Sequence, residues 1–448
     1  MTESHTKSRL GTERKGLFLS LRAAVAWGCV LSSLCLSIGA TRAIAAPQQN
    51  TNPAPKQKAN AAAKSAADST EFKKLAARAT EAREQNRLQE AAELYEKALG
   101  LNPRWQEGWW YLGSLDYDAN KYGDGVKAFR NLVELDRKNI PALALLGLCE
   151  FETDDYGNAF VHLQMAKSKN QALNDELWNV VQYHLALLHI LHGDFETAND
   201  ILSILVKHNI LSEDVKMALG LTLLRVPVFP DQIDPEKDAL VSEAGKTGEL
   251  IALNDYNEAD KSFQQLISDY LTTPFVHYSY AAMLSGLSEY EKAEEQLREE
   301  IKINPESAMP YTLLAYVDVR LNRFQDALPF AQEAVKLAPQ SFTAHYLLGR
   351  ALLATDKVTD AVDELSTAKR LAPESSEIRY NLAVALARAK RPQEAAAEQA
   401  EFRRLSALAQ SKRSGGASDV KNSSRNSSEP GEIGPDQLQS PPARVPHQ

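Results

Sequence analysis

Cysteine and aromatic residues are scarce in this sequence. Of its 448 residues, three are Cys and 7% are Phe, Trp or Tyr. Cys29 and Cys35 lie within the first 45 residues, so Cys149 is the one cysteine of the remaining sequence, which excludes an intramolecular disulfide there. Stability must therefore come from packing, and the abundance of Leu and Ala favours a helical body.

Sequence motifs for catalysis are also missing. There is no Gly-rich phosphate loop, no Gly-x-Ser-x-Gly elbow and no His-Glu-x-x-His. His184, His189 and His192 cluster near Asp194, but the first two stand about 140° apart on a helix and cannot share one metal. Cys149 has no neighbouring base, which predicts a buried, inert thiol. We expect no enzyme activity, no cofactor and no metal; an enzyme built on residues 210–239 is the remote alternative.

Positive charge is outnumbered by negative charge outside the amino-terminal segment. Residues 1–45 hold six basic and two acidic residues, so the rest of the chain is four charges more negative than the −9 of the whole. Phosphate binding needs clustered Lys and Arg. The charge balance therefore argues against a nucleic-acid partner.

The first 45 residues have the features of an export signal. A basic start precedes an uncharged run from Ala23 to Ala40, and Ala43-Ile44-Ala45 offers a cleavage site. Cleavage would leave the protein periplasmic or secreted. The run is also just long enough to span a bilayer, so an uncleaved membrane anchor over residues 23–40 stays open as the alternative.

What the sequence does contain is a period of 34 residues. Small residues and prolines keep this step in the second half of the chain: Ala259, Ala293, Ala327, Ala361 and Ala395, with Pro305, Pro339 and Pro373. A fixed period of this length is typical of stacked helical hairpins, and proline ends each hairpin. The predicted fold class is all-α, an α-solenoid of about nine antiparallel hairpins.

Interruptions of the 34-residue period divide the chain into two blocks. Ala91, Gly125 and Ala159 keep the step of 34, but Ala198 comes 39 residues later and Ala259 a further 61. The predicted parts are a signal peptide or anchor (1–45), a flexible linker (46–69), an N-terminal block (70–209), an irregular joint (210–239), a C-terminal block (240–410) and a disordered tail (411–448).

Three prolines forbid a continuous helix in the irregular joint, after a helix capped by Ser212. Two interpretations stay open. The joint is either a plain linker between the blocks or a protruding loop that touches a partner with Val228 and Phe229.

The body of the chain resembles the tetratricopeptide repeat family. The segment Trp109-Trp110-Tyr111-Leu112-Gly113 matches the opening of the family's first helix. Its final Leu-Gly pair occurs again at Leu348-Gly349. Ala91, Tyr95, Ala98 and Pro103 match the second helix and its terminator. The resemblance covers about three quarters of the chain. It implies a superhelix that holds proteins or peptides in a concave groove lined by first helices.

One face of the predicted first helices carries tyrosine and arginine. Positions two apart on a helix point in nearly opposite directions, so Tyr346 and Arg350 lie opposite the packed Leu348 and Leu352. The same track in the neighbouring repeats adds Tyr278, Tyr316, Arg320, Tyr380 and Arg388. Such residues are enriched at interfaces, and arginine favours a partner with acidic groups. The alternative is that the tyrosines fill gaps between adjacent helices, with the arginines stacked on them.

The corresponding face of the N-terminal block is more apolar and carries Trp110, Tyr117 and Phe151. These residues either bind a hydrophobic segment or are buried within the block. The function predicted is an exported scaffold for protein–protein interactions through the groove. A membrane-anchored structural or assembly factor of the cell envelope is the alternative.

Overall fold

The computed structural model describes the backbone of residues 55–169 and 172–416. This part of the chain is helical and contains no strand, so the predicted all-α class is confirmed. The predicted signal or anchor (1–45) and most of the predicted tail (411–448) lie outside the described residues. The predicted linker (46–69) differs from the structure beyond residue 54, because helix α3 already begins at Pro55. That stretch is rich in Ala and Lys, which are strong helix formers.

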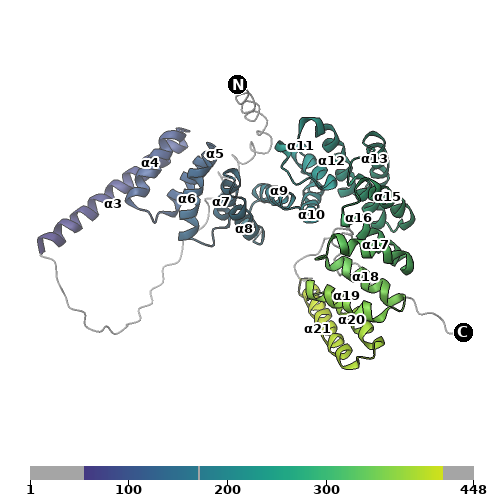
Figure 1. Cartoon of the computed structure of the whole chain (residues 1–448). Helices are drawn as coiled ribbons and strands as arrows, with labels where there is room; N and C mark the ends of the chain where they lie inside the picture. Colours follow the sequence, from purple (N-terminus) through teal and green to yellow (C-terminus); the bar gives the residue numbers. More distant parts are fainter. Residues whose placement is uncertain (1–54, 170–171, 417–448) are drawn as a thin grey trace, which may run out of the picture. The chain divides into compact units, whose positions relative to one another are not determined.

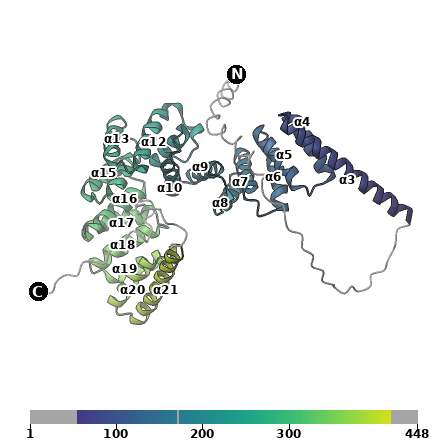
Figure 2. The ribbon, with the colours of Figure 1, turned by 180° about the vertical axis from the view of Figure 1, so that it is seen from behind.

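The chain divides into two compact units, residues 1–188 and 189–448. In the first unit consecutive helices pack as hairpins, α3 with α4, α5 with α6 and α7 with α8. Figures 1 and 2 show these pairs side by side. Their bounds are α3 Pro55–Glu84, α4 Leu88–Leu101, α5 Gln106–Asp118, α6 Tyr122–Leu135, α7 Ile140–Glu152 and α8 Tyr156–Lys167, followed by α9 Asp175–Leu191, which contains the unit boundary.

The second unit continues the same arrangement. Its hairpins are α12 with α13, α14 with α15, α16 with α17, α18 with α19 and α20 with α21, and α11 packs closely on α12. The first helices α14, α16, α18 and α20 also contact one another in order. The bounds are α10 Phe195–Lys207, α11 Glu213–Leu224, α12 Asp238–Ala252, α13 Tyr256–Asp269, α14 Val276–Gly286, α15 Tyr290–Ile303, α16 Ala308–Arg320, α17 Phe324–Leu337, α18 Phe342–Ala354, α19 Val358–Leu371, α20 Ser376–Arg388 and α21 Pro392–Gly416.

A left-handed backbone conformation marks the turn inside each hairpin. Turn residues with φ between 58° and 64° recur every 34 residues in these hairpins: Asn86, Asn120 and Asp154 in the first unit, and Asn254, Ser288, Asn322, Asp356 and Lys390 in the second. Asn209, after α10, has a similar φ of 62° but lies outside the series. The residue after each of them donates its N–H to a carbonyl five positions back, as Arg323 does to Asp318 at 2.8 Å. This Schellman motif ends the first helix and starts the second.

The two helices of a hairpin cross at a small residue of the first helix. A β-carbon at Gly113 would lie 2.9 Å from the Phe129 ring, and one at Gly349 would lie 2.6 Å from Leu365 Cγ. The residue that faces each glycine is thus a large one on the second helix, Phe129 or Leu365. Gly125 lies one turn before Phe129, and a β-carbon on it would lie 2.9 Å from Cys149 Sγ on the next first helix.

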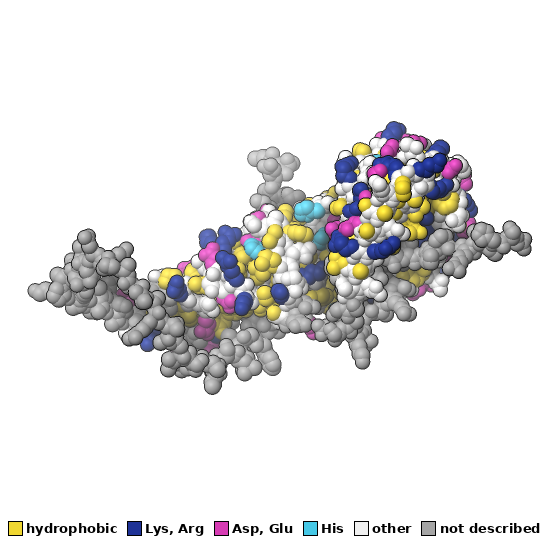
Figure 3. Space-filling view, turned by 90° about the horizontal axis from the view of Figure 1, so that it is seen from below, with side chains coloured by type: hydrophobic (Ala, Val, Ile, Leu, Met, Phe, Trp, Pro, Cys, Tyr) yellow, Lys and Arg dark blue, Asp and Glu magenta, His cyan; other side chains and the backbone are white. Residues whose placement is uncertain are grey.

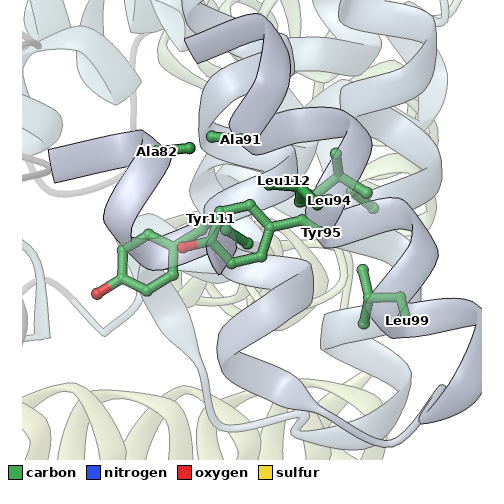
Figure 4. Packing of buried hydrophobic residues seen from close by; sticks show 9 residues of the cluster. Ala82, Ala91, Leu94, Tyr95, Leu99, Tyr111 and Leu112 are labelled. Carbon is green, nitrogen blue, oxygen red and sulfur yellow. The ribbon is translucent and has the colours of Figure 1, made fainter. Parts of the chain in front are cut away.

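Figure 4 shows the core of the first unit, where α3, α4 and α5 meet. The rings of Tyr95 and Tyr111 lie 5.7 Å apart and are buried with Leu94 and Leu112. Ala82 of α3 and Ala91 of α4 face each other with no exposed surface, so the two backbones approach closely. Small residues thus set the spacing of helices, and aromatic rings fill the space between repeats.

The irregular joint is a hairpin with a long connection. Helices α11 and α12 cross so closely that a β-carbon at Gly220 would lie 2.0 Å from the Val241 carbonyl oxygen. The connection between them contains two short 3₁₀ helices, η2 (Pro230–Gln232) and η3 (Pro235–Lys237). Phe229 is only 5% exposed, and Val228 is half-buried. The interpretation of a protruding loop that presents both side chains is therefore wrong, because Phe229 is used to fix the connection to the fold.

Gly349→Ala is expected to lower the free energy of unfolding by about 1–3 kcal/mol, because the new methyl group would press on Leu365. Urea unfolding monitored by far-UV circular dichroism measures the change. The matched control is Gly157→Ala in α8, where a β-carbon meets no atom within 4 Å. The control should be neutral or slightly stabilising, and equal losses from the two variants would contradict the crossing contact.

Candidate functional site

The predicted track of tyrosines lies on the first helices of the second unit. Tyr278 on α14, Tyr316 on α16 and Tyr346 on α18 are 3%, 7% and 4% exposed, whereas Tyr380 on α20 is 47% exposed. Three of the four rings therefore fill space between adjacent first helices. This is the arrangement that the alternative interpretation predicts, and it leaves only the edges of these rings for a partner.

Tyr346 bridges two repeats. Its hydroxyl donates to Glu377 Oε1 at 2.6 Å and accepts from Asn381 Nδ2 at 3.2 Å, and both partners lie on α20. Burial raises the pKa of Tyr346 well above its usual value, so the hydroxyl stays a donor. The track is thus part of the stacking of one first helix on the next.

Two arginines of the track pack over tyrosine rings in cation–π contacts. The Arg320 guanidinium lies 5.6 Å from the centre of the Tyr290 ring and 5.8 Å from that of Tyr316, and that of Arg350 lies 5.9 Å from the Tyr346 ring. Neither guanidinium pairs with a carboxylate among the described residues. Aromatic support orders both side chains and leaves their charge uncompensated.

Arg388 differs from the other two arginines. It donates through Nη1 to the Leu353 carbonyl at 2.7 Å and through Nη2 to Asp356 Oδ1 at 2.8 Å. The guanidinium thereby ties α20 to the end of α18 and the turn that follows. Of the three predicted arginines, the structure leaves Arg320 and Arg350 as the candidates for a ligand.

An open hollow of about 710 Å³ lies beside the start of the track. The N-terminal turns of α16 and α18 contribute Met309 and Thr343, and Arg225 contributes from the end of α11. Thr343 is 3% exposed, and its hydroxyl has no hydrogen-bond partner within the part of the chain that the structure describes. The remaining lining is His192, Gly193, Asp194, Glu196, Thr197, Tyr278, Ala308, Thr312, Leu313, Ala338 and Ser341. The lining combines apolar and polar groups, as in peptide-binding sites.

Arg225 forms one wall of this hollow. It ends α11 in the left-handed conformation, with φ of 54°, pairs with Glu196, and lies 4.9 Å from the centre of the Tyr278 ring. Desolvation raises the pKa of Tyr278 to about 12. A second, smaller hollow of about 150 Å³ shares Glu196, Arg225 and Tyr278 with the first. The irregular joint thus contributes Arg225 to both hollows, which sequence analysis did not predict.

The predicted N-terminal residues are held in contacts within their own unit. Tyr117 is buried against Tyr122, with ring centres 5.6 Å apart. Phe151 contacts the His184 ring edge-on at 4.8 Å, and Trp110 contacts Phe129 at 6.1 Å. Of the two interpretations left open, burial within the block agrees better with these contacts.

The other chemical candidates are also occupied. His184 Nδ1 lies 2.8 Å from the Val180 carbonyl, and His189 Nδ1 lies 2.9 Å from Asp194 Oδ2. Cys149 is fully buried, and burial raises the pKa of its thiol. A thiol in this state is unreactive.

The sequence model of the tetratricopeptide repeat matches residues 76–140, 312–375 and 364–409. These segments fall on the helical hairpins of both units. The chain therefore contains tetratricopeptide repeats in these segments. Proteins of this family are generally non-enzymatic scaffolds, and the repeat fold supports a role in protein–protein interaction.

Several solved structures are similar to part of this chain. A MamA RS-1 double mutant is 20% identical over 38% of this chain and 95% of its own, with a TM-score of 0.36. MamA 41-end from Desulfovibrio magneticus RS-1 is 20% identical over 37% and 94%, at 0.35. YrrB, described as a TPR protein with an unusual peptide-binding site, is 18% identical over 38% and 88%, at 0.34. No curated protein matches the chain.

A buried carboxyl group on α16 breaks the pattern of leucines in the second unit. Asp318 is 1% exposed, and neither of its carboxylate oxygens has a hydrogen-bond partner among the described residues. The equivalent positions in α14, α18 and α20 are buried leucines: Leu284, Leu352 and Leu386. Desolvation raises the pKa of Asp318 to about 6, and the nearby carboxylates of Glu294 and Asp326 act in the same direction.

Asp318→Leu is expected to stabilise the protein at pH 7.5 by about 1–3 kcal/mol, since it removes a buried, unpartnered carboxylate. The pKa of Asp318 in the folded protein lies above its ordinary value of 3.8, so the contribution of this carboxyl to stability falls as pH rises from about 4 to about 6. The gain should therefore shrink toward pH 4. Urea unfolding at several pH values measures it, with the exposed Glu306→Gln as control. A gain independent of pH would contradict the assignment.

Among the described residues no helix is both long and apolar enough to cross a bilayer. The predicted anchor over residues 23–40 lies outside this part of the chain. The choice between a cleaved signal and an anchor therefore stays a prediction.

Proposed function

We propose that this repeat protein binds an extended peptide segment of a partner protein on the first-helix face of its second unit. The observation that supports the proposal is the pair Arg320 and Arg350, two ordered guanidinium groups with no carboxylate partner among the described residues. The hollow at the amino-terminal ends of α16 and α18 provides a place for apolar side chains of the same peptide. Ordered groups lose little conformational entropy on binding.

The charge of these groups defines the ligand. A guanidinium that is held by an aromatic ring binds carboxylates through charge-assisted hydrogen bonds. The ligand is therefore a peptide with acidic side chains. Neighbouring first helices lie roughly 8–10 Å apart, and an extended peptide advances about 3.3 Å per residue. Two carboxylates about three or four residues apart would reach both arginines.

The hollow adds an apolar requirement. Met309 and Leu313 line it from α16, the helix that carries Arg320 at its other end. Burial of one or two apolar side chains there would supply binding energy in proportion to the area removed from water. The ligand is thus an acidic segment with an apolar residue to one side of the acids.

The test is a displayed peptide library selected on the full chain. Enriched peptides should carry two acids about three or four residues apart. The Arg320→Gln, Arg350→Gln double variant should bind them on the order of 100-fold more weakly, since each lost charge-assisted bond costs about 1.5 kcal/mol or more. Isothermal titration measures both affinities.

The matched control is the Lys302→Gln, Lys336→Gln variant. It removes two positive charges from exposed positions on second helices. This variant should bind the selected peptides almost as the parent does. Selected peptides without acids, or equal binding by the two double variants, would refute the proposed site.

We further propose that the chain is exported, as its first 45 residues predict, and that its partners are proteins of the cell envelope. When the full sequence is expressed in a bacterium, amino-terminal sequencing should find a mature protein that begins near Ala46, recovered in the periplasmic or secreted fraction. A chain that retains residues 23–40 and sediments with membranes would support the anchored assembly factor instead. Recovery in the cytoplasm at full length would contradict both.

A further inference from the structure

The last first helix, α20, has an open face that its counterparts lack. Tyr380 stands one period after Tyr346, yet it is 47% exposed where Tyr346 is 4% exposed. Val384, one turn further on, is 36% exposed. Phe402 of α21 supports the Tyr380 ring at 5.4 Å but leaves its other side uncovered. We use the term open face of α20 for Tyr380 and Val384 with Phe402 at their edge.

The repeat before it shows what covers such a face. In α18 the corresponding tyrosine is covered by α20, which presents Glu377 as an acceptor and Asn381 as a donor to the Tyr346 hydroxyl. These two polar residues are four apart, so they lie on one side of the helix. Leu382 and Ala385 of the same helix are buried within the unit. A helix with this pattern is the natural complement of the open face.

The composition of the chain after α21 fits that helix poorly. Residues 417–448 contain Pro430, Pro435 and Pro441 and are rich in Ser, which disfavours an α-helix of useful length. A second copy that presents the same face fits poorly too. It would place Tyr380 against Tyr380, while Glu377 already accepts from Tyr346.

Charge near the face is largely compensated. Arg388 pairs with Asp356 and Arg391 pairs with Glu394, and Lys390 is exposed in the turn after α20. Figure 3 views the molecule from the side on which α20 and α21 lie in Figure 1, and it shows hydrophobic side chains interspersed with charged side chains of both signs on this unit. Apolar contact and the Tyr380 hydroxyl, more than net charge, therefore define the partner helix.

We propose that the open face of α20 docks an amphipathic α-helix of a partner protein, which extends the stack of first helices by one. The helix carries Glu at one position and Asn or Gln four residues later, so that the Tyr380 hydroxyl donates to the first and accepts from the second. Its apolar residues cover Val384 and the exposed side of the Tyr380 ring. This site is separate from the peptide site at Arg320 and Arg350.

The probe is a peptide with the sequence of Ser376–Arg388, made helical by a hydrocarbon staple on its solvent side and labelled with a fluorophore. Its helicity is verified by circular dichroism before use, because unconstrained helices of this length are marginal in water. Fluorescence anisotropy with the full chain should show saturable binding. Tyr380→Ala in the protein should weaken it at least tenfold.

A double-mutant cycle isolates the hydroxyl contact. Tyr380→Phe in the protein and Glu377→Gln in the peptide should each weaken binding about threefold to tenfold, and the two together no more than either alone. Tyr311→Phe, a tyrosine of α16 outside the track, is the matched control and should leave binding unchanged. Since Tyr380 is half exposed, its variants should keep the parent's circular dichroism spectrum.

Three results would overturn the proposal. The first is no binding of the helical probe, and the second is binding that Tyr380→Ala does not change. The third is concentration-dependent sedimentation of the full chain that Tyr380→Ala abolishes, which would make a second copy the occupant. The Arg320→Gln, Arg350→Gln variant should bind the helix normally, so failure of the peptide site and failure of this site are distinguishable.

Discussion

The structure depends on one repeated constraint: the two helices of each hairpin must approach closely enough that their packing residues fill the space between repeats. A small residue on the first helix permits this approach, as Gly349 does against Leu365, and a left-handed turn residue reverses the chain within a few residues. Each hairpin then presents an apolar face that only its neighbour can cover. Stability is accordingly distributed along the chain as a sum of neighbouring contacts.

Much of this architecture could be predicted because the packing residues repeat by identity. Alanine at 259, 293, 327, 361 and 395 reveals the period directly. The left-handed turn residues keep the same period, but they were not recognised because Asn, Asp, Ser and Lys alternate there. What they share is a backbone conformation, which Asn and Asp adopt at low cost and Ser and Lys at higher cost. A search for Asn or Asp at a fixed distance before the alanines would have found most of them.

The candidate site was less predictable. Helical geometry correctly placed Tyr346 and Arg350 on one track, but it could not show how closely the next first helix approaches that track. Because α20 packs on α18, Tyr346 is buried against Glu377. Tyr380 has no such neighbouring helix among the described residues and is therefore exposed. Arg225 could not be predicted at all, since its position follows from the close crossing of α11 and α12 at Gly220. Asp318 was missed because an acid at a leucine position does not disturb the alanine period.

The shared wall of the two hollows in the second unit has a thermodynamic consequence. One guanidinium, that of Arg225, separates them and is held by Glu196 and the Tyr278 ring. A ligand that binds the Arg225 guanidinium from one hollow would change the electrostatic field and the free volume in the other hollow. The binding free energies of ligands in the two hollows would then be coupled, and the coupling must be equal in both directions. In a repeat scaffold of this kind, a ligand bound at Arg225 in one hollow would thus alter the affinity of the other.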